Sequence, residues 1–207
     1  MTILNMIKPT FKYIYNTFQF FMNYFQKFNL LFILILNKVN YKEIPIVNGY
    51  IFLRCNGIFN IGQNLKLNSN LRSNPIGGDE KCKFIIAENA ILSIGNNVGI
   101  SNSTIYCCKS IIIEDNVFIG GSTKIYDTDF HSLNFEKRIS KDDDIKHKPI
   151  MICKNVFIGA HSIILKGVKI GEASIIGAGS VVTKNIPKNE IWAGNPAKFI
   201  KEINLAK

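Results

Sequence analysis

The 207-residue sequence has few cysteines, few histidines and no long apolar run. Its five cysteines form no CxxC pair, so they make a poor disulfide framework and are expected as reduced, cytosolic thiols. No two cysteines or histidines stand at the spacing of zinc ligands, and no metal is expected. The best apolar stretch, residues 30–36, is far shorter than the roughly 20 residues of a membrane span.

Acidic residues are also scarce. The chain carries 25 basic and 15 acidic residues, a net charge of +10 that predicts an anionic partner such as a nucleic acid, an acidic membrane or a phosphate-bearing small molecule. No basic stripe interleaved with aromatics is present, so no nucleic acid is expected as a partner. With 47% hydrophobic and 19% charged residues the chain can fill the core of one domain, which excludes wholesale disorder.

Residues 1–44 differ in kind from the rest. Apolar residues recur there at steps of three or four, as on one helical face: Ile7, Phe11, Ile14, Phe18, Phe21, Phe25, Phe28, Phe32 and Ile35. The spacing predicts an amphipathic helix, and the segment lacks the small-residue cleavage site of a secretory signal. Two interpretations stay open: the helix packs on the domain, or it rests on the inner membrane face with its aromatics inserted.

The strongest pattern is a six-residue period. Six aliphatic residues follow one another at that spacing: Ile152, Ile158, Ile164, Ile170, Ile176 and Val182. A small or β-branched residue stands four positions after each of the first five: Val156, Ser162, Val168, Ser174 and Ser180. Neither a helix nor an alternating strand repeats in this way. The period predicts an all-β fold, a triangular parallel β-helix of 18 residues per coil with aliphatic residues inside and small ones at the corners.

A similar register appears upstream. The expected inward positions are Ile94, Ile100, Tyr106, Ile113, Ile119 and Ile125, and the expected corner positions are Val98, Thr104, Ser110, Val117 and Thr123. The seven-residue step after Tyr106 predicts a bulge near residues 107–110, and residues 61–71 carry a weaker version of the repeat. We therefore predict a helical segment at 1–44, a prism at 45–187 interrupted by a loop at 127–149, and a C-terminal tail at 188–207.

Three motifs resemble the hexapeptide-repeat acyltransferases. They are Asn-Val-Phe-Ile-Gly-Ala at 155–160, Ile-Gly-Ala-Gly-Ser-Val-Val-Thr-Lys at 176–184, and Ala-Gly-Asn-Pro-Ala-Lys at 193–198. The resemblance covers residues 85–204 and is nearest to maltose and galactoside O-acetyltransferases and to sugar O-acetyltransferases of surface-polysaccharide pathways. It implies a left-handed β-helix, an exception to the usual right-handed crossover, and a homotrimer with active sites between neighbouring prisms.

The family's catalytic histidine falls on His131, in the loop where the repeat fails. Loops on a rigid scaffold commonly carry chemistry, and a neutral imidazole can remove a proton from an alcohol as it attacks a thioester. Asp127 or Asp129 is expected to orient the ring, and the sequence does not separate the two. His161 is expected at a surface or interface, and His147 as a solvated loop residue.

The resemblance also implies two binding surfaces. On the acceptor side Asn102 aligns with a family asparagine, although a corner asparagine with a left-handed backbone is a competing explanation. Arg138 is the second acceptor candidate, and Cys107 and Cys108 stand where the family carries carboxylates. On the donor side the implied contacts are the backbone of Ala160 and Ala178 for the pantetheine arm, and Thr183, Lys184 and Lys198 for the nucleotide and phosphate end of coenzyme A.

These observations favour an enzyme that transfers an acetyl group directly from acetyl-CoA to a sugar hydroxyl of a surface polysaccharide, glycan or precursor. Its expected location is the cytoplasm or the inner membrane face. The alternatives are another acceptor (a nucleotide-linked amino sugar, an antibiotic or serine) and a non-catalytic trimeric scaffold. A zinc carbonic anhydrase on the same prism would need three histidines with two closely spaced, a pattern that the sequence lacks.

Overall fold

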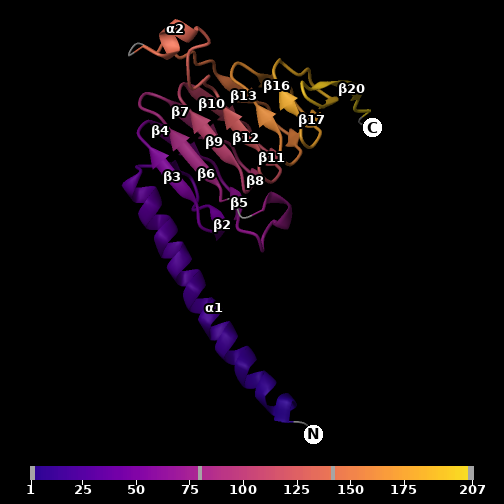
Figure 1. Ribbon diagram of the computed structural model, residues 1–207. Coiled ribbons are helices and arrows are strands. Elements are labelled where there is room, and N and C mark those ends of the chain that lie inside the picture. The colour runs from indigo at the N-terminus through magenta and orange to yellow at the C-terminus, as the bar shows by residue number, and fades with distance from the viewer. Residues whose placement is uncertain (1–2, 79–80, 141–142, 205–207) are drawn as a thin grey trace.

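The computed structural model describes residues 3–78, 81–140 and 143–204, and it consists of one long helix and a prism of short strands (Figure 1). Helix α1 (Ile3–Leu36) is 34 residues long. It ends where Lys38 adopts a φ of 49°, and the Val39 amide donates to the Leu34 carbonyl over 3.0 Å. Within the described residues no helix combines the length and the hydropathy needed to cross a bilayer.

The prism is built from three sheets. Sheet A contains β1 (Asn40–Tyr41), β4 (Ile58–Ile61), β7 (Ile91–Ile94), β10 (Ser110–Ile113), β13 (Ile150–Ile152) and β16 (Lys169–Ile170). Sheet B contains β2 (Ile46–Gly49), β5 (Lys66–Ser69), β8 (Gly99–Ser101), β11 (Phe118–Ile119), β14 (Phe157–Ile158), β17 (Ile175–Ile176), β19 (Glu190–Ala193) and β20 (Lys198–Glu202). Sheet C contains β3 (Phe52–Cys55), β6 (Lys83–Ile86), β9 (Thr104–Cys107), β12 (Lys124–Tyr126), β15 (Ile163–Ile164) and β18 (Val181–Val182).

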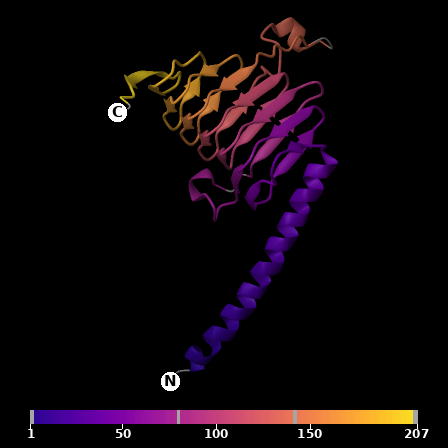
Figure 2. The same ribbon diagram turned by 180° about the vertical axis from the view of Figure 1, so that it is seen from behind.

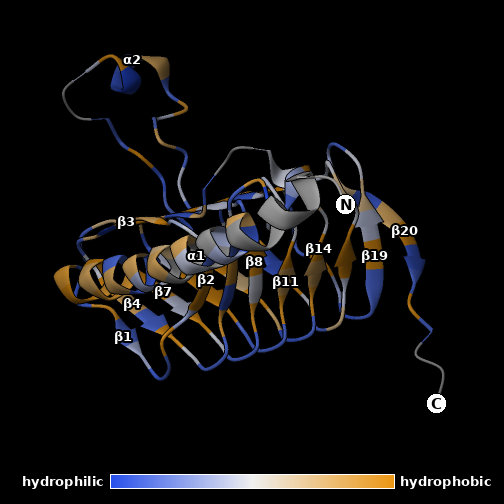
Figure 3. Ribbon diagram, turned by 90° about the horizontal axis from the view of Figure 1, so that it is seen from below, coloured by the Kyte–Doolittle hydropathy of each residue, from blue (hydrophilic) through white to orange (hydrophobic). Residues whose placement is uncertain are grey.

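The six-residue period sets the register of the last coils as predicted. Each coil pairs in parallel with the next, and Ile152 pairs with Ile170 while Ile164 pairs with Val182, in each case 18 residues apart. The aliphatic residues of the period are fully buried. They therefore form the core, and each strand inside a sheet hydrogen-bonds to the strands on both sides of it, so that the coils stack (Figure 3).

Corner hydroxyls show what a small residue four positions after an aliphatic residue can do. Ser162 Oγ donates to the Gly159 carbonyl over 2.8 Å and lies 3.2 Å from the Gly177 carbonyl in the next coil. Thr123 Oγ1 contacts the Gly120 and Gly159 carbonyls in the same way, over 2.9 and 3.3 Å. Each hydroxyl satisfies carbonyls that the turn would otherwise bury without a partner.

The upstream register differs from the prediction at one coil. Ile105, not Tyr106, is the fully buried inward residue of β9, and Ser103, not Thr104, is the fully buried corner residue. The corner before β9 is one residue shorter than a hexad allows and the corner after it is longer. Side chains alternate along the strand, so a shift of one residue turned Tyr106 outward. Ser110, expected at a corner, instead begins β10.

A second interruption of the repeat, at residues 70–82, was not predicted. Leu71, assigned to the weak repeat, is 50% exposed, and a short helix η1 (Pro75–Gly77) follows. This segment folds back over later coils, because Ser122 Oγ donates to the Gly77 carbonyl over 2.8 Å and His161 Nε2 lies 3.2 Å from the Ile76 carbonyl. Its turn-forming asparagines, proline and glycines were the sequence signal for it.

Both ends of the prism extend beyond the predicted bounds. β1 lies within the segment assigned to the N-terminal helix, and β19 pairs in parallel with β17 inside the expected tail. Among the described side chains of α1, those buried against the prism are Leu30 and Leu34, near its C-terminal end. The rest of α1 extends away from the prism, on the side opposite the excursion that carries α2 (Phe135–Arg138) (Figures 1 and 2).

Candidate active site

The predicted loop at 127–149 leaves the prism between β12 and β13 and returns through a short two-stranded neck. Thr128 and His147 form an antiparallel bridge. The Asp129 amide donates to the Lys146 carbonyl over 3.1 Å, and the Lys148 amide donates to the Asp127 carbonyl over 2.9 Å. The neck fixes where the loop begins, so the residues just after it have defined positions.

Phe130 and His131 point in different directions from this neck. Phe130 adopts a φ of 64°, and its ring packs on Tyr106 and Tyr126 of sheet C, with centroid distances of 5.0 and 5.3 Å. The ring anchors the loop to the prism. The next residue, His131, projects its side chain into solvent with 69% of its surface exposed.

The ring of His131 is oriented by Asp143, across the loop. His131 Nδ1 lies 2.9 Å from Asp143 Oδ2. An ionised carboxylate only accepts hydrogen bonds, so Nδ1 carries the proton and Nε2 keeps its lone pair. The exposed Nε2 is therefore a base available to an incoming hydroxyl.

Asp143 is itself held by the loop backbone. Its Oδ1 accepts from the Ser132 amide over 2.6 Å. The hydrogen bond from His131 and the one from the Ser132 amide hold the pKa of Asp143 below its usual range, with a further contribution from the charge of Arg138. Arg138, the predicted acceptor contact, donates from Nη1 to the Ser132 carbonyl over 3.3 Å. It therefore supports the same turn.

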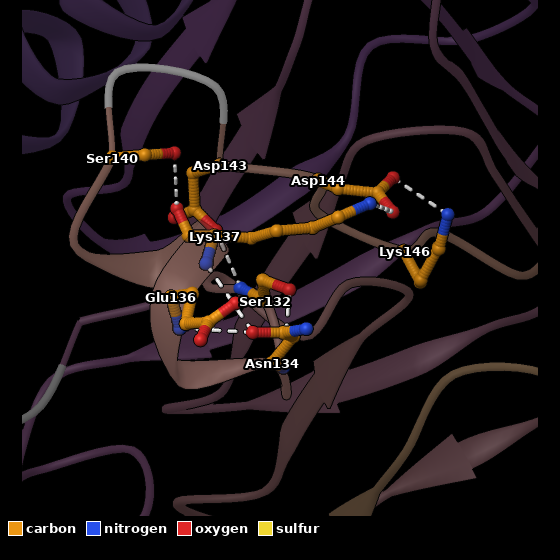
Figure 4. Close-up of polar contacts among 8 residues, drawn as sticks. All are labelled: Ser132, Asn134, Glu136, Lys137, Ser140, Asp143, Asp144 and Lys146. Atoms are coloured by element: carbon orange, nitrogen blue, oxygen red, sulfur yellow. Dashed lines mark hydrogen bonds and ion pairs between the residues drawn. The ribbon is translucent and has the colours of Figure 1, made fainter.

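The remainder of the loop is stabilised by a helix cap and two ion pairs (Figure 4). The Asn134 side chain accepts from the Glu136 amide over 2.8 Å and so caps α2. Asp144 bridges Lys137 and Lys146 at 3.0 and 2.6 Å. Asp144 thus ties α2 to the returning chain, whereas its neighbour Asp143 serves His131.

Asp127 is a structural residue of the prism. It is fully buried, and its carboxylate accepts from the amides of Cys108, Lys109 and Ser110 over 2.6 to 2.8 Å. These amides lie at the predicted bulge, where the longer corner leaves them without ladder partners. Burial, then the charge of Asp127, raises the pKa of the Cys107 and Cys108 thiols.

Asp129 pairs with Lys166 at 3.0 Å, and both side chains are about four-fifths buried. The pair joins the neck of the loop to the turn after β15. Within the described part of the chain, neither Asp127 nor Asp129 contacts His131. The carboxylate at the imidazole is Asp143, a residue that the sequence interpretation missed because only the folding of the loop brings positions 131 and 143 together.

The predicted donor residues Ala160 and Ala178 lie on one edge of the prism, where sheet B turns into sheet C. The coils approach so closely there that a Cβ on Gly159 would lie 2.5 Å from the Ala178 nitrogen. In the described residues neither the Ala160 amide nor the Ala178 amide donates a hydrogen bond. The edge therefore presents a narrow, smooth surface with amide donors one coil apart.

The predicted cationic residues gather at the C-terminal end of the prism. Thr183 and Lys184 are exposed after β18, and Lys184 Nζ lies 5.1 Å from the centroid of the Trp192 ring. This cation–π contact positions the ammonium group. Lys198 is exposed at the start of β20, beside the edge that contains Ala178.

Asn102 is fully buried at the same edge, with a φ of 44°, and its Nδ2 lies 3.3 Å from the Gly78 carbonyl. The corner-asparagine explanation thus accounts for its backbone. β9 separates it from the Tyr106 ring on which the His131 loop packs, a distance of about 13 Å along the strand. One chain therefore places His131 and the small-residue edge at opposite borders of sheet C. Among the described residues, no group of three or more His, Cys, Asp or Glu side chains could hold a metal ion.

Comparison with known proteins defines the class of this fold. Residues 149–184 match the family model "Bacterial transferase hexapeptide (six repeats)", and residues 110–125 match "Hexapeptide repeat of succinyl-transferase". The fold is a left-handed parallel β-helix, as the sequence predicted, and two segments of it are similar to hexapeptide repeats of transferases.

Its relatives include named enzymes. The chain is 41% identical over 119 residues to galactoside O-acetyltransferase of Escherichia coli (strain K12), covering 54% of this chain and 57% of that protein. A structure of galactoside acetyltransferase in complex with coenzyme A is 36% identical, with a TM-score of 0.55, and the match covers 68% of this chain and 64% of that one. The hexapeptide-repeat acetyltransferase of Vibrio cholerae O1 biovar eltor, complexed with acetyl coenzyme A, is 32% identical, with a TM-score of 0.54 and coverage of 58% and 65%.

The chain spans about half the length of the curated relatives it matches. Both family-model matches, residues 110–125 and 149–184, lie within the prism.

Proposed function

We propose that the protein is an acetyltransferase that moves the acetyl group of acetyl-CoA to a hydroxyl group of a sugar. The observation that carries the proposal is the contact between His131 Nδ1 and Asp143 Oδ2 at 2.9 Å, which leaves Nε2 exposed as a base. The likeness to galactoside O-acetyltransferase supports the same reaction class.

The reaction needs no covalent enzyme intermediate. His131 Nε2 takes the proton of the acceptor hydroxyl as its oxygen attacks the thioester carbonyl. Asn102 or a backbone amide at the small-residue edge of a neighbouring copy stabilises the oxyanion of the tetrahedral intermediate. When the carbon–sulfur bond breaks, the imidazolium gives its proton to the departing thiolate. The products are an acetyl ester and coenzyme A, and Asp143 stabilises the transient charge on His131.

The donor site follows the small-residue edge. The amides of Ala160 and Ala178, which donate no hydrogen bond within the described residues, would bind a pantetheine arm, and no large side chain of theirs would obstruct it. Lys184 and Lys198 supply positive charge at the end where the phosphates would lie. Two structures similar to this chain contain coenzyme A or acetyl coenzyme A, which supports this donor.

A homotrimer would complete the site. His131 and the small-residue edge lie at opposite borders of sheet C in one chain, so the loop of one copy must meet the edge of another for transfer to occur. The loop is suited to this contact, because its apolar side chains Leu133, Phe135 and Ile139 are 61 to 81% exposed. A neighbouring prism would cover them.

The acceptor we propose is a hydroxyl of a surface polysaccharide, a glycan or its precursor. The test is incubation of the full-length protein and acetyl-CoA with a panel of galactosides, hexoses, oligosaccharides, a nucleotide-linked amino sugar and serine. Coenzyme A release should be followed by chromatography, because the chain's own five cysteines would react with thiol reagents. We expect sugar-dependent release and a base-labile acetyl ester on the sugar.

Release with serine or the nucleotide-linked amino sugar alone would keep the enzyme class and change the acceptor. Failure of the folded protein to bind acetyl-CoA in a calorimetric titration would refute the proposal and leave the prism as a scaffold. A matched Lys184→Ala variant should bind acetyl-CoA more weakly if the donor site is placed correctly.

A further inference from the structure

Helix α1 presents an apolar face that the prism does not cover. Leu30 and Leu34 are buried against the prism, 7 and 1% exposed, whereas Phe25, Phe28 and Phe32 are 53 to 68% exposed. Residues 30 and 34 share one side of the helix, and residues 25, 28 and 32 share another side. The exposed face continues toward the N-terminus through Phe18 and Phe11, 58 and 66% exposed.

The composition of this segment is as unusual as its exposure. α1 contains ten aromatic residues among its 34 positions, seven of them among the 15 phenylalanines of the whole chain. Five lysines and no acidic residue precede Glu43, so this segment supplies half of the net charge of +10. Lys12 and Lys27 are exposed. A partner that covers this helix must therefore match both its positive charge and its aromatic face.

We propose that α1 lies along an anionic lipid surface, with its aromatic face inserted at the level of the headgroups. Helices that bind in this way combine a polar, basic side with a side rich in Phe, Leu and Trp. Attraction between lysines and anionic headgroups brings the helix to the surface, and burial of the phenylalanines holds it there. This inference does not depend on the proposed transfer reaction.

The face turned toward the prism agrees with this orientation. Gln26, Lys27 and Leu30 line a cleft between α1 and the segment Ile44–Asn48 at the start of sheet B. The side of α1 that carries Gln26, Lys27 and Leu30 therefore faces the prism, and the side that carries Phe25, Phe28 and Phe32 faces away from it. Bound to lipid, the helix would keep the prism on the water side, with the His131 loop on the far side of the prism (Figures 1 and 2).

A second copy of the chain is the competing occupant. The apolar residues from Phe11 to Ile35 also fit the two core positions of a heptad repeat, the pattern of a coiled coil. The positions flanking such a seam, however, hold none of the charged pairs that set partner choice. Exposed Tyr15 and Leu36, 54 and 63%, instead widen the apolar face beyond a narrow seam. The width of the apolar face and the presence of lysines without acidic residues in this segment favour a lipid surface over a second copy.

The test is flotation of the full-length protein with two kinds of vesicle, one of phosphatidylcholine alone and one containing about a third phosphatidylglycerol. We expect binding to the anionic vesicles, weaker binding to the neutral ones, and a fall of the anionic binding toward the neutral level at high salt. The triple variant Phe25→Gln, Phe28→Gln, Phe32→Gln should lower the bound-to-free ratio at least about tenfold. The double variant Lys12→Gln, Lys27→Gln should lower it on anionic vesicles only.

The matched control replaces three exposed aliphatic residues outside α1, as Leu71→Gln, Ile76→Gln, Ile200→Gln, and should float like the unmodified protein. Light scattering would record the oligomeric state of every variant. Equal flotation of the phenylalanine variant and the unmodified protein would overturn the proposal, as would an absence of binding to either vesicle. A loss of oligomers in the phenylalanine variant with unchanged flotation would assign the face to another copy.

Discussion

At the scale of single residues, the orientation of the His131 ring depends on a carboxylate twelve positions further along the chain. Asp143 fixes the ring orientation and the tautomer, and it is held by the Ser132 amide. Asp127, although closer in sequence to His131, uses its carboxylate to satisfy three backbone amides of the prism. Asp143 therefore acts electrostatically on His131, whereas Asp127 has a structural role in the prism.

Removing the Asp143 carboxylate should slow transfer without unfolding the chain. We expect Asp143→Asn to lower kcat by about tenfold or more, because an amide no longer stabilises the imidazolium. Asp144→Asn is the matched control, since Asp144 pairs with lysines only, and it should leave kcat within about twofold. Equal effects of the two substitutions in steady-state kinetics would contradict the assignment.

The lowered pKa of Asp143 has a consequence for pH. A carboxyl whose pKa is depressed in the folded protein keeps its contacts above the usual carboxyl range and loses them only as the pH falls through the lowered pKa. The Asp143 contact should therefore persist throughout the neutral and mildly acidic range in which kcat is measured.

Substituting Asp127 should act on stability. Asp127→Ala would leave three buried amides unpaired, and we expect a loss of about 3 kcal/mol or more in urea unfolding. Asp129→Ala removes the partner of the mostly buried Lys166 but leaves no backbone amide unpaired, so we expect it to cost less stability than Asp127→Ala in the same assay. An Asp127→Ala protein with unchanged stability but no activity would instead make Asp127 a catalytic residue.

At the scale of elements, the hexapeptide coil explains both the core and the proposed donor edge. Glycines and alanines recur where sheet B turns into sheet C, since the coils there are too close for larger side chains. The same closeness leaves a smooth edge with amide donors. One physical requirement, tight corners, therefore serves folding and binding together.

The edge can be tested by blocking it. Ala178 is exposed, so Ala178→Val should leave the unfolding transition nearly unchanged. We expect its affinity for acetyl-CoA in calorimetry to fall about tenfold or more, because the added methyl groups obstruct the pantetheine arm. Lys154→Val, at another edge, is the control and should bind normally. Normal binding by both variants would place the donor elsewhere.

The elements differ in how far the sequence could predict them. The last coils followed from their period, because six aliphatic residues in one register leave no other inward face. The predicted register of the coil at Tyr106 is wrong by one residue. The corner before β9 is short and the corner after it is long, so the two deviations nearly cancel in the sequence spacing of the neighbouring coils. The segment at 70–82 has no periodicity to read, although its turn residues marked it. Asp143 could not be found, because a loop's folding depends on its own tertiary contacts.

At the scale of the whole molecule, three parts have separate roles. The prism provides rigidity, the loop at 127–149 carries the proposed base, and α1 extends from the opposite side (Figure 2). His131 and the donor edge are too far apart in one chain to act on the same substrate. Acetyl transfer would therefore require contact between copies of the chain. The exposed apolar residues at the tip of the loop form the surface that would make this contact.

Polar substitution of the loop tip should separate the copies. We expect Leu133→Ser, Phe135→Ser, Ile139→Ser to shift the protein from trimer to smaller species in light scattering, because burial of three large apolar side chains is lost. Activity should fall with the trimer. The double variant Leu71→Ser, Ile200→Ser is the control and should remain trimeric, and a loop-tip variant that stays trimeric and active would refute this interface.

The most direct test of the whole account is the turnover of His131→Ala beside its binding of acetyl-CoA. The proposed contacts to acetyl-CoA come from Ala160, Ala178, Lys184 and Lys198 and not from His131, so we predict an unchanged dissociation constant by calorimetry. We predict that transfer to the preferred sugar falls by roughly 10²- to 10⁴-fold, the contribution of a general base. Near-normal turnover by this variant would contradict the account.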